Sequence, residues 1–163
     1  MKRLLFLSFL LLCTLLSVAS SEKADKKIRQ NEILVSSFIE ALNTKDMDKL
    51  TSLFTEDGTY EEVCSGRLNK GREAIANYIQ VTLEGIPDSK FELVSISCNA
   101  NHAIFEWIWK GTNTVGWPAM NLPPTGKYLE LRGVSVMDIE NGRIRANRDY
   151  WDWNSFMKGI GAK

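Results

Sequence analysis

The sequence predicts a single α+β domain, in which N-terminal helices cover one face of a curved, mainly antiparallel sheet. Helical periodicity comes first along the chain and strand-like segments follow it, and this order is typical of the class. The length of 163 residues suits one domain, and 44% hydrophobic with 25% charged residues is an ordinary globular composition. Disordered and collagen-like chains are therefore excluded.

Residues 1–20 have the three-part pattern of a secretory signal peptide. Two basic residues precede an apolar run, and the small residues Ala19 and Ser20 come just before a polar stretch. We therefore expect cleavage near this point, a domain over residues 21–163, a secreted or periplasmic location and no membrane association after cleavage. The apolar run is short for a spanning helix, so an uncleaved membrane anchor is the less favoured alternative.

Three helices and a strand are predicted in the first half of the mature chain. Apolar residues at helical spacing predict a helix over Asp25–Leu42, and a short second helix follows with Asp46 and Asp48 in its first turn. Thr59–Val63 alternates as a short strand, and Arg72–Leu83 repeats the helical pattern. These helices supply the layer that covers the sheet.

The second half of the chain is strand-like and predicts an antiparallel meander. Its expected strands are Phe91–Cys98, His102–Lys110, Tyr128–Met137 and Ile144–Trp153. The loop Gly111–Lys127 exceeds the usual connection length and carries Trp117 and Met120, so we expect it to form the rim of a pocket.

Charge and motif content exclude several classes of protein. Twenty basic residues balance twenty acidic ones, so a basic surface for nucleic acid is not indicated. His102 is the one histidine, which excludes a metal site built on several imidazoles, and no nucleotide or dinucleotide motif occurs. We expect no metal and no cofactor. Cys64 and Cys98 are equally compatible with a disulfide and with two free thiols.

Carboxylates near aromatic residues are the remaining candidates for chemistry. Alternation in the short strand puts Glu62 on the same face as Tyr60, and Glu106 lies within a strand of otherwise apolar character. Apolar surroundings raise the pKa of a carboxyl group and make it a useful acid or base at neutral pH. The alternative for Glu106 is an ion pair with an arginine of a neighbouring strand.

The last predicted strand carries two acidic residues on opposite faces. Strict alternation from Ile144 puts Arg148, Tyr150 and Asp152 on one face and Asp149 on the other face with Trp151. We expect the face that begins at Ile144 to point inward, which would bring Asp152 into a pocket. An ion pair with a neighbouring arginine is the alternative for Asp152 as well.

Several segments resemble the SnoaL-like polyketide cyclase branch of the NTF2-like superfamily. They are Leu53–Glu62, Gly71–Ile75, Gly111-Thr112, Pro123–Lys127, Asn141–Ile144 and Arg148–Asp152. The resemblance covers nearly all of the mature chain. It implies a cone-shaped fold in which a curved sheet wraps around a deep apolar pocket, often within a homodimer.

The resemblance also implies roles for individual residues. Polyketide cyclases of this branch use an aspartate of the final strand as general acid/base, at the position of Asp152, and ketosteroid isomerases place their base near Glu62. We therefore predict Asp152 and Glu62 as catalytic residues. The predicted ligand-binding residues are Tyr60, Glu106, Trp117, Met120, Arg148 and Tyr150. The arginine–aspartate pair of limonene-epoxide hydrolases is missing, which argues against epoxide hydrolysis.

Taken together, these observations predict an exported enzyme that uses a pocket carboxylate to move a proton next to a carbonyl group of a small apolar molecule. The reaction would be of the isomerase, cyclase or lyase type, with a tyrosine hydroxyl stabilising the enolate oxygen. A non-catalytic protein that binds an apolar ligand, and a dimeric interaction protein of the same fold, are the alternatives.

Overall fold

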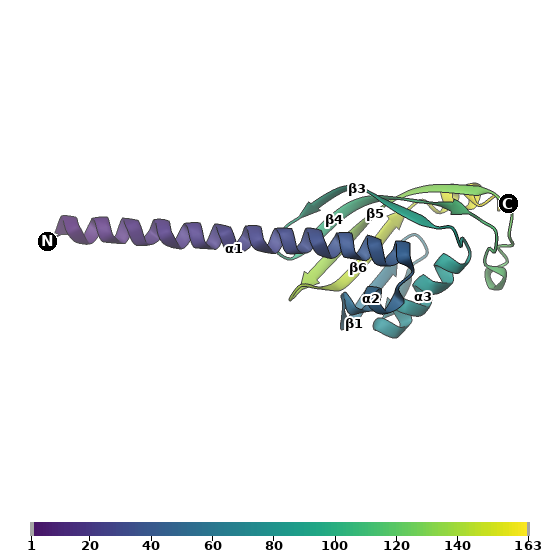
Figure 1. Ribbon diagram of the computed structural model, residues 1–163, viewed down its shortest axis with the longest axis horizontal. Coiled ribbons are helices and arrows are strands. Elements are labelled where there is room, and N and C mark those ends of the chain that lie inside the picture. The colour runs from purple at the N-terminus through teal and green to yellow at the C-terminus, as the bar shows by residue number, and fades with distance from the viewer. Residues whose placement is uncertain (1, 163) are drawn as a thin grey trace.

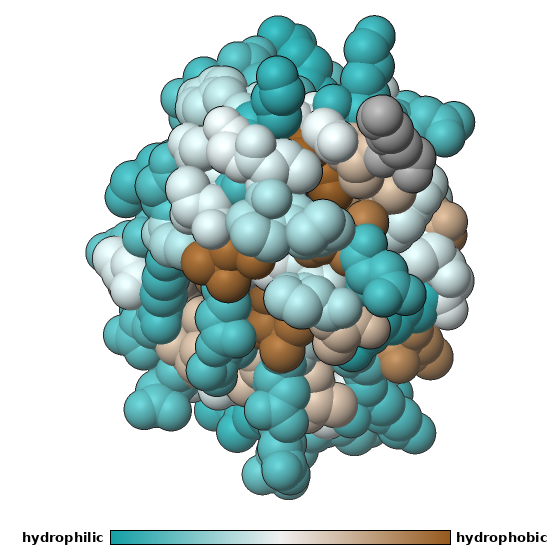
Figure 2. All heavy atoms as spheres, turned by 90° about the vertical axis from the view of Figure 1, so that its right-hand side faces the viewer, coloured by the Kyte–Doolittle hydropathy of each residue, from teal (hydrophilic) through white to brown (hydrophobic). Residues whose placement is uncertain are grey.

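The computed structural model describes the backbone of residues 2–162 and the side chains of residues 21–162. Figure 1 shows a long N-terminal helix whose C-terminal part lies against a curved sheet, with two shorter helices beside it. Figure 2 shows that hydrophobic side chains reach the surface between polar ones at the end of the molecule opposite the N-terminus. The elements in chain order are α1 (Lys2–Thr44), α2 (Met47–Ser52), β1 (Phe54–Glu62), β2 (Arg67–Lys70), α3 (Arg72–Glu84), β3 (Lys90–Cys98), β4 (His102–Thr112), the 3₁₀ turn η1 (Pro118–Met120), β5 (Tyr128–Glu140), β6 (Arg143–Trp151) and α4 (Trp153–Gly159).

The six strands form one sheet in the order β2-β1-β6-β5-β4-β3. Neighbouring strands are antiparallel except β1 and β6, which run parallel because the helices and the meander separate them in sequence. The predicted α+β class with a curved, mainly antiparallel sheet is therefore confirmed (Figure 1).

The individual elements follow the sequence pattern, but several bounds differ, and β1 begins at Phe54 rather than at Thr59. The connection expected between the short strand and the third helix contains β2, which pairs with β1 as an edge strand. The last strand ends at Trp151 rather than Trp153, because the Asp152 carboxylate accepts a hydrogen bond from the Ser155 amide and starts α4. The N-terminus of α2 is capped in the same way by Asp46.

Helix α1 extends well beyond the helix predicted for the mature chain. Its bounds are Lys2–Thr44, so it includes the backbone of the segment predicted as a signal peptide. The side chains of residues 1–20 lie outside the described part of the structure, and export stays a prediction. Among the residues that are described, no helix is long and apolar enough to cross a membrane.

Aromatic contacts tie α1 to the sheet. Phe38 is buried and meets the ring of Phe54 from β1 and the ring of Phe105 from β4, with centroids 6.3 and 6.2 Å away. Edge-on contacts of this kind add to the free energy that burial of apolar surface provides. The helix therefore closes the concave side of the sheet and forms one wall of the interior.

A β-bulge at Arg145 decides which side chains of β6 face that interior. Asp138 pairs with Ala146, but the next residue, Ile139, pairs with Ile144, so Arg145 has no partner on β5. One extra residue in a strand reverses the alternation beyond it.

The consequence is visible in the burial of β6. Ile144 is fully buried, yet beyond the bulge Asn147 and Asp149 are buried and Tyr150 is exposed. The prediction that the face beginning at Ile144 stays inward as far as Asp152 is therefore wrong, because it assumed an uninterrupted strand.

Candidate functional site

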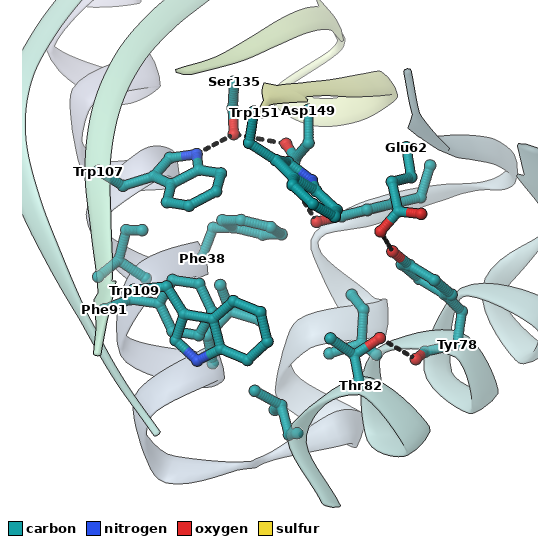
Figure 3. Close-up of a pocket in the computed structure, with 15 residues that line it drawn as sticks. Phe38, Glu62, Tyr78, Thr82, Phe91, Trp107, Trp109, Ser135, Asp149 and Trp151 are labelled. Atoms are coloured by element: carbon teal, nitrogen blue, oxygen red, sulfur yellow. Dashed lines mark hydrogen bonds between the residues drawn. The ribbon is translucent and has the colours of Figure 1, made fainter. Parts of the chain in front are cut away.

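Two adjoining chambers occupy the space between the helices and the concave face of the sheet. The inner chamber has a volume of about 50 Å³ and the outer chamber about 180 Å³. They share the lining residues Glu62, Tyr78, Thr82, Trp109 and Trp151. The walls are mainly aromatic, and Figure 3 shows tryptophan and phenylalanine rings on one side and Glu62 with Tyr78 on the other.

Asp149 is a buried carboxylate at the wall of the inner chamber (Figure 3). It accepts hydrogen bonds from the Tyr60 hydroxyl, from Ser135 Oγ at 2.6 Å and from Asn147 Nδ2 at 2.7 Å. Burial raises the pKa of Asp149 above its ordinary value, and the three hydrogen bonds oppose that rise because they stabilise the charged form. The carboxylate is thus held in one orientation by three donors.

Trp107 extends this network to β4. Its indole Nε1 donates to Ser135 Oγ at 2.8 Å, and Ser135 in turn donates to Asp149. The ring reaches Ser135 because its strand neighbour is Gly133, where a Cβ atom would stand 2.3 Å from the indole. Gly133 is therefore required for the close approach of the ring.

Glu62 lies at the end of β1 and is the one carboxylate among the described residues that line both chambers. It is half-buried and accepts hydrogen bonds from the Tyr78 hydroxyl at 2.5 Å and from the Ser65 hydroxyl. Burial, followed by the charge of Glu62, raises the pKa of Tyr78, so this phenol remains a hydrogen-bond donor at neutral pH. The arrangement joins a carboxylate and a donor at the boundary of the two chambers.

The two carboxylates occupy paired positions. Glu62 of β1 is the register partner of Asp149 of β6, and Tyr60 is the register partner of Asn147. Because neighbouring positions on one face of a sheet bring side chains together, two acidic groups stand side by side on the wall of the inner chamber.

Asp152, predicted as a catalytic residue, does not reach either chamber. Its exposed carboxylate accepts the Ser155 amide at 2.6 Å as the N-cap of α4, and this hydrogen bond lowers the pKa of Asp152. The expectation that Asp152 points into the pocket is therefore wrong, and so is the alternative of an arginine ion pair. The cause is the bulge at Arg145 together with the start of α4.

Three predicted ligand-binding residues lie on the outer face of the sheet. Arg148 forms a two-pronged ion pair with Asp138, at 2.7 and 3.1 Å, and Tyr150 is 45% exposed. Glu106 is exposed and accepts a hydrogen bond from Ser95 Oγ at 2.5 Å rather than from an arginine. The placement of these three residues in the pocket is corrected by the structure.

The other predicted residues line the chambers. Tyr60 and Glu62 line the inner chamber, and Trp117 and Met120 line the outer one. The long loop that carries Trp117 and Met120 thus contributes to the pocket wall, while their roles in binding stay predictions.

The sequence prediction missed Asp149 and its partner Ser135. A signal was present, because the face assigned to Asp149 also carried Trp151 and Asn147, which are typical companions of a buried polar network. The face assigned to Asp152 carried an arginine. Composition of the two faces, rather than continuation of the alternation from Ile144, would have selected Asp149.

Cys64 and Cys98 are free thiols, so the alternative of a disulfide is not realised. Burial, followed by the charge of Glu62, raises the pKa of Cys64 to about 11. Within the described residues, no group of three or more His, Cys, Asp and Glu side chains is arranged to hold a metal ion.

The fold is that of an NTF2-like, ketosteroid isomerase-like protein. Residues 35–147 match the sequence profile of the SnoaL-like domain, and the chain belongs to that family. Membership of this family supports a small-molecule enzyme or a small-molecule binding protein in general terms.

Solved structures support the same fold. A protein from Jannaschia sp. CCS1, designated a SnoaL-like polyketide cyclase, superimposes with a TM-score of 0.75 at 17% identity over 83% of this chain and 94% of that one. IdmH from Streptomyces antibioticus, designated a polyketide cyclase, gives 0.70 at 20% identity over 80% and 98%. A protein from Catenulispora acidiphila with a ketosteroid isomerase-like fold, in complex with trimethylamine, gives 0.69 at 18% identity over 80% and 93%.

Proposed function

We propose that the protein is an enzyme that moves a proton next to a carbonyl group of a small molecule, with Glu62 as the general acid/base. The observation that carries this proposal is the position of Glu62, whose half-buried carboxylate lines both chambers beside the Tyr78 hydroxyl. The mainly aromatic walls around Glu62 limit the water that reaches the reacting carbon.

In the proposed mechanism, the Glu62 carboxylate removes a proton from the carbon next to the carbonyl. The C–H bond breaks, an O–H bond forms on Glu62, and the electron pair moves to the carbonyl oxygen to give an enolate. Protonated Glu62 is a poorer acceptor, so the Tyr78 hydroxyl is free to turn and donate to the enolate oxygen. Return of the proton to a different atom completes an isomerisation. In a cyclisation, the enolate carbon attacks a second carbonyl, the C=O π bond opens to an alkoxide, and Glu62 returns its proton to that alkoxide.

The proposed role of Asp149 is positioning. Its carboxylate already accepts three hydrogen bonds, which leaves it little capacity to accept a proton from a substrate without the loss of a donor. Asp149 lies beside Glu62 in the register of β1 and β6 and holds Tyr60 and Ser135 in the wall of the inner chamber. Asp149 would therefore fix the shape of the wall against which a ligand lies.

Exchange of carbonyl-adjacent protons for deuterium tests the proposal without knowledge of the natural substrate. Small uncharged cyclic ketones are incubated with protein in D₂O and followed by proton NMR. Wild type is expected to accelerate exchange above the buffer rate, and Glu62→Gln to reduce that acceleration by about 10²–10⁴-fold. Glu106→Gln is the matched control, because Glu106 lies on the outer face of the sheet. The proposal would be contradicted if no probe showed accelerated exchange, or if the acceleration survived in Glu62→Gln.

A non-catalytic binding protein is the second candidate. It is favoured by the hydrogen bonds that the pocket carboxylates already accept from other side chains of the protein. Glu62 accepts two hydrogen bonds and Asp149 accepts three, so neither is idle in the empty pocket. A binding protein would hold its ligand and give no exchange in the same experiment.

We also propose that the protein is exported and forms a homodimer. The signal-like pattern of residues 1–20 supports export, and the mass of the protein recovered from the periplasm or medium would reveal cleavage near Ser20.

Exposed apolar side chains on the outer face of the sheet, among them Ile104 and Tyr150 at 49% and 45% exposure, support a dimer through that face.

A further inference from the structure

The pocket carries two carboxylates that form no ion pair with a basic side chain of the described residues. Glu62 and Asp149 are register partners on neighbouring strands, and both line the inner chamber. The ion pairs of the described residues all lie elsewhere, and neither carboxylate takes part in one. Two acidic groups side by side near apolar walls create a potential that favours a cation.

Aromatic rings line the outer chamber beside the carboxylate of Glu62. Phe156 lies at the centre of the cluster, with ring centroids of Trp109, Trp117, Trp151 and Trp153 at 6.0, 5.5, 5.3 and 5.7 Å. The indole N–H groups of Trp109 and Trp117 donate to Ser89 Oγ and to the Val81 carbonyl, both at 2.9 Å. The polar N–H groups of these two rings are thus engaged by the protein, so the parts of both rings that line the chamber are apolar.

One ring of the wall already holds a cation. The Arg67 guanidinium lies 4.8 Å from the centroid of the Tyr78 ring, within the range of a cation–π contact. Arg67 comes from the edge strand β2 and also lines the outer chamber, where its guanidinium lies against the Tyr78 ring and forms no ion pair with Glu62.

The size of the outer chamber limits the ligand to a compact group. Its volume of about 180 Å³ is comparable with the cavity of about 150 Å³ that accommodates benzene in another protein. A branched alkylammonium head fills such a space, and its diffuse charge is less costly to remove from water than that of a primary ammonium ion.

From charge, walls and size together, we propose that the outer chamber binds a compact organic cation, an alkylated ammonium group, with π surface around it and Glu62 at its inner side. This inference names the ligand class for the site of the proposed acid–base chemistry. It rests on the proposed function only in taking this pocket as the functional site. The reacting part of the ligand would then extend into the inner chamber, past Glu62.

The test compares two probes of the same shape and different charge. Choline and its neutral isostere 3,3-dimethylbutan-1-ol are titrated into the full mature chain, with binding followed by calorimetry and tryptophan fluorescence. Choline is expected to bind at least about tenfold more tightly than the isostere. Glu62→Gln is expected to reduce that preference several-fold, and Glu106→Gln to leave it unchanged.

A variant of the wall provides a second arm. Trp153 is only half-buried, so Trp153→Leu retains apolar volume while it removes π surface, and it is expected to weaken choline more than the isostere. Equal binding of the two probes, preference for the neutral probe, binding of neither, or a preference that persists in Glu62→Gln would each overturn the proposal. Proton exchange on neutral ketones is measured separately, so the cation proposal and the acid–base proposal fail independently.

Discussion

The Tyr60 hydroxyl of β1 donates a hydrogen bond to the Asp149 carboxylate of β6, and this contact joins the two parallel strands of the sheet at the wall of the inner chamber. Burial, followed by the charge of Asp149, raises the pKa of Tyr60, so the phenol stays a donor over the physiological range. The pair stabilises the floor of the pocket and leaves Glu62 as the acidic group that faces both chambers.

Asp149→Asn is expected to change how stability depends on pH. Burial raises the pKa of Asp149 in the folded protein above its unfolded value of about 4. The stability that this shift contributes is present below about pH 4 and is lost as the pH rises through the folded pKa. The free energy of unfolding of wild type should therefore decline, relative to that of the variant, as the pH increases from about 4.

Urea unfolding of both proteins over a series of pH values measures this difference. Titrations shared by the two proteins cancel in the comparison, so the slope reports on residue 149. A gap between wild type and variant that stays constant with pH, or that changes in the opposite direction, would show that Asp149 does not titrate abnormally.

Asp152→Ala is expected to lower the melting temperature by a few degrees and to leave pocket chemistry intact. The change removes the acceptor for the Ser155 amide at the N-terminus of α4, while the pocket residues keep their contacts. Asp152→Ser is the matched control, because serine is also a good N-cap. Loss of proton exchange or choline binding in a folded Asp152→Ala protein would return Asp152 to the functional site.

Gly133→Ala is expected to destabilise the protein by about 1–3 kcal/mol through overpacking. The added methyl group would stand 2.3 Å from the Trp107 ring, which would have to leave its hydrogen bond to Ser135. The same change should cost less in a Trp107→Phe background, where the ring is smaller. A double-mutant cycle by urea unfolding measures the coupling, and additive effects of the two changes would contradict this account.

Glu62→Gln is expected to accelerate alkylation of Cys64. The pKa of this thiol is raised to about 11 by burial and then by the charge of Glu62, so removal of the charge increases the thiolate fraction at a given pH. Iodoacetamide labelling followed by mass spectrometry gives the rate. Cys98 is the internal reference, because its pKa is raised by burial and by Glu32 instead. An unchanged ratio of the two rates would mean that Glu62 does not act on Cys64.

Ile104→Lys is expected to convert the proposed homodimer to a monomer. Ile104 is exposed on the outer face of β4, and a charged side chain there would have to be desolvated at an interface. Light scattering coupled to gel filtration gives the mass of each protein. Glu84→Lys on α3, away from that face, is the control, and a wild type that is monomeric at high concentration would exclude the dimer.

Most of the fold could be predicted from the sequence because its elements have strong periodicity. Apolar spacing located α1 and α3, and Asp46 marked the start of α2. The edge strand β2 was missed because its four residues are mostly exposed and carry no alternation of apolar and polar residues. Such a strand is defined by its partner, β1, rather than by its own sequence.

The candidate site was predicted in part for the same reason. Tyr60 and Glu62 lie in a short strand without interruption after Thr59, so alternation placed both correctly. Asp149 lies beyond a bulge, where alternation counted from Ile144 assigns each side chain to the wrong face of the sheet. The carboxylate of Asp152 caps the N-terminus of a helix. Both effects arise from pairing and capping, which periodicity does not encode.

The bulge at Arg145 also shows that the inward position of Asp149 is set by the partner strand. Deletion of Arg145 would place the pair Ile144–Ile139 directly next to the pair Ala146–Asp138, and the rest of β6 would keep its partners on β5. Asp149 would then stay opposite Ser135 and face the interior. A chain of this fold that is one residue shorter at this position can therefore keep the same acidic pocket, because pairing with β5, rather than the length of β6, selects the side chains that line it.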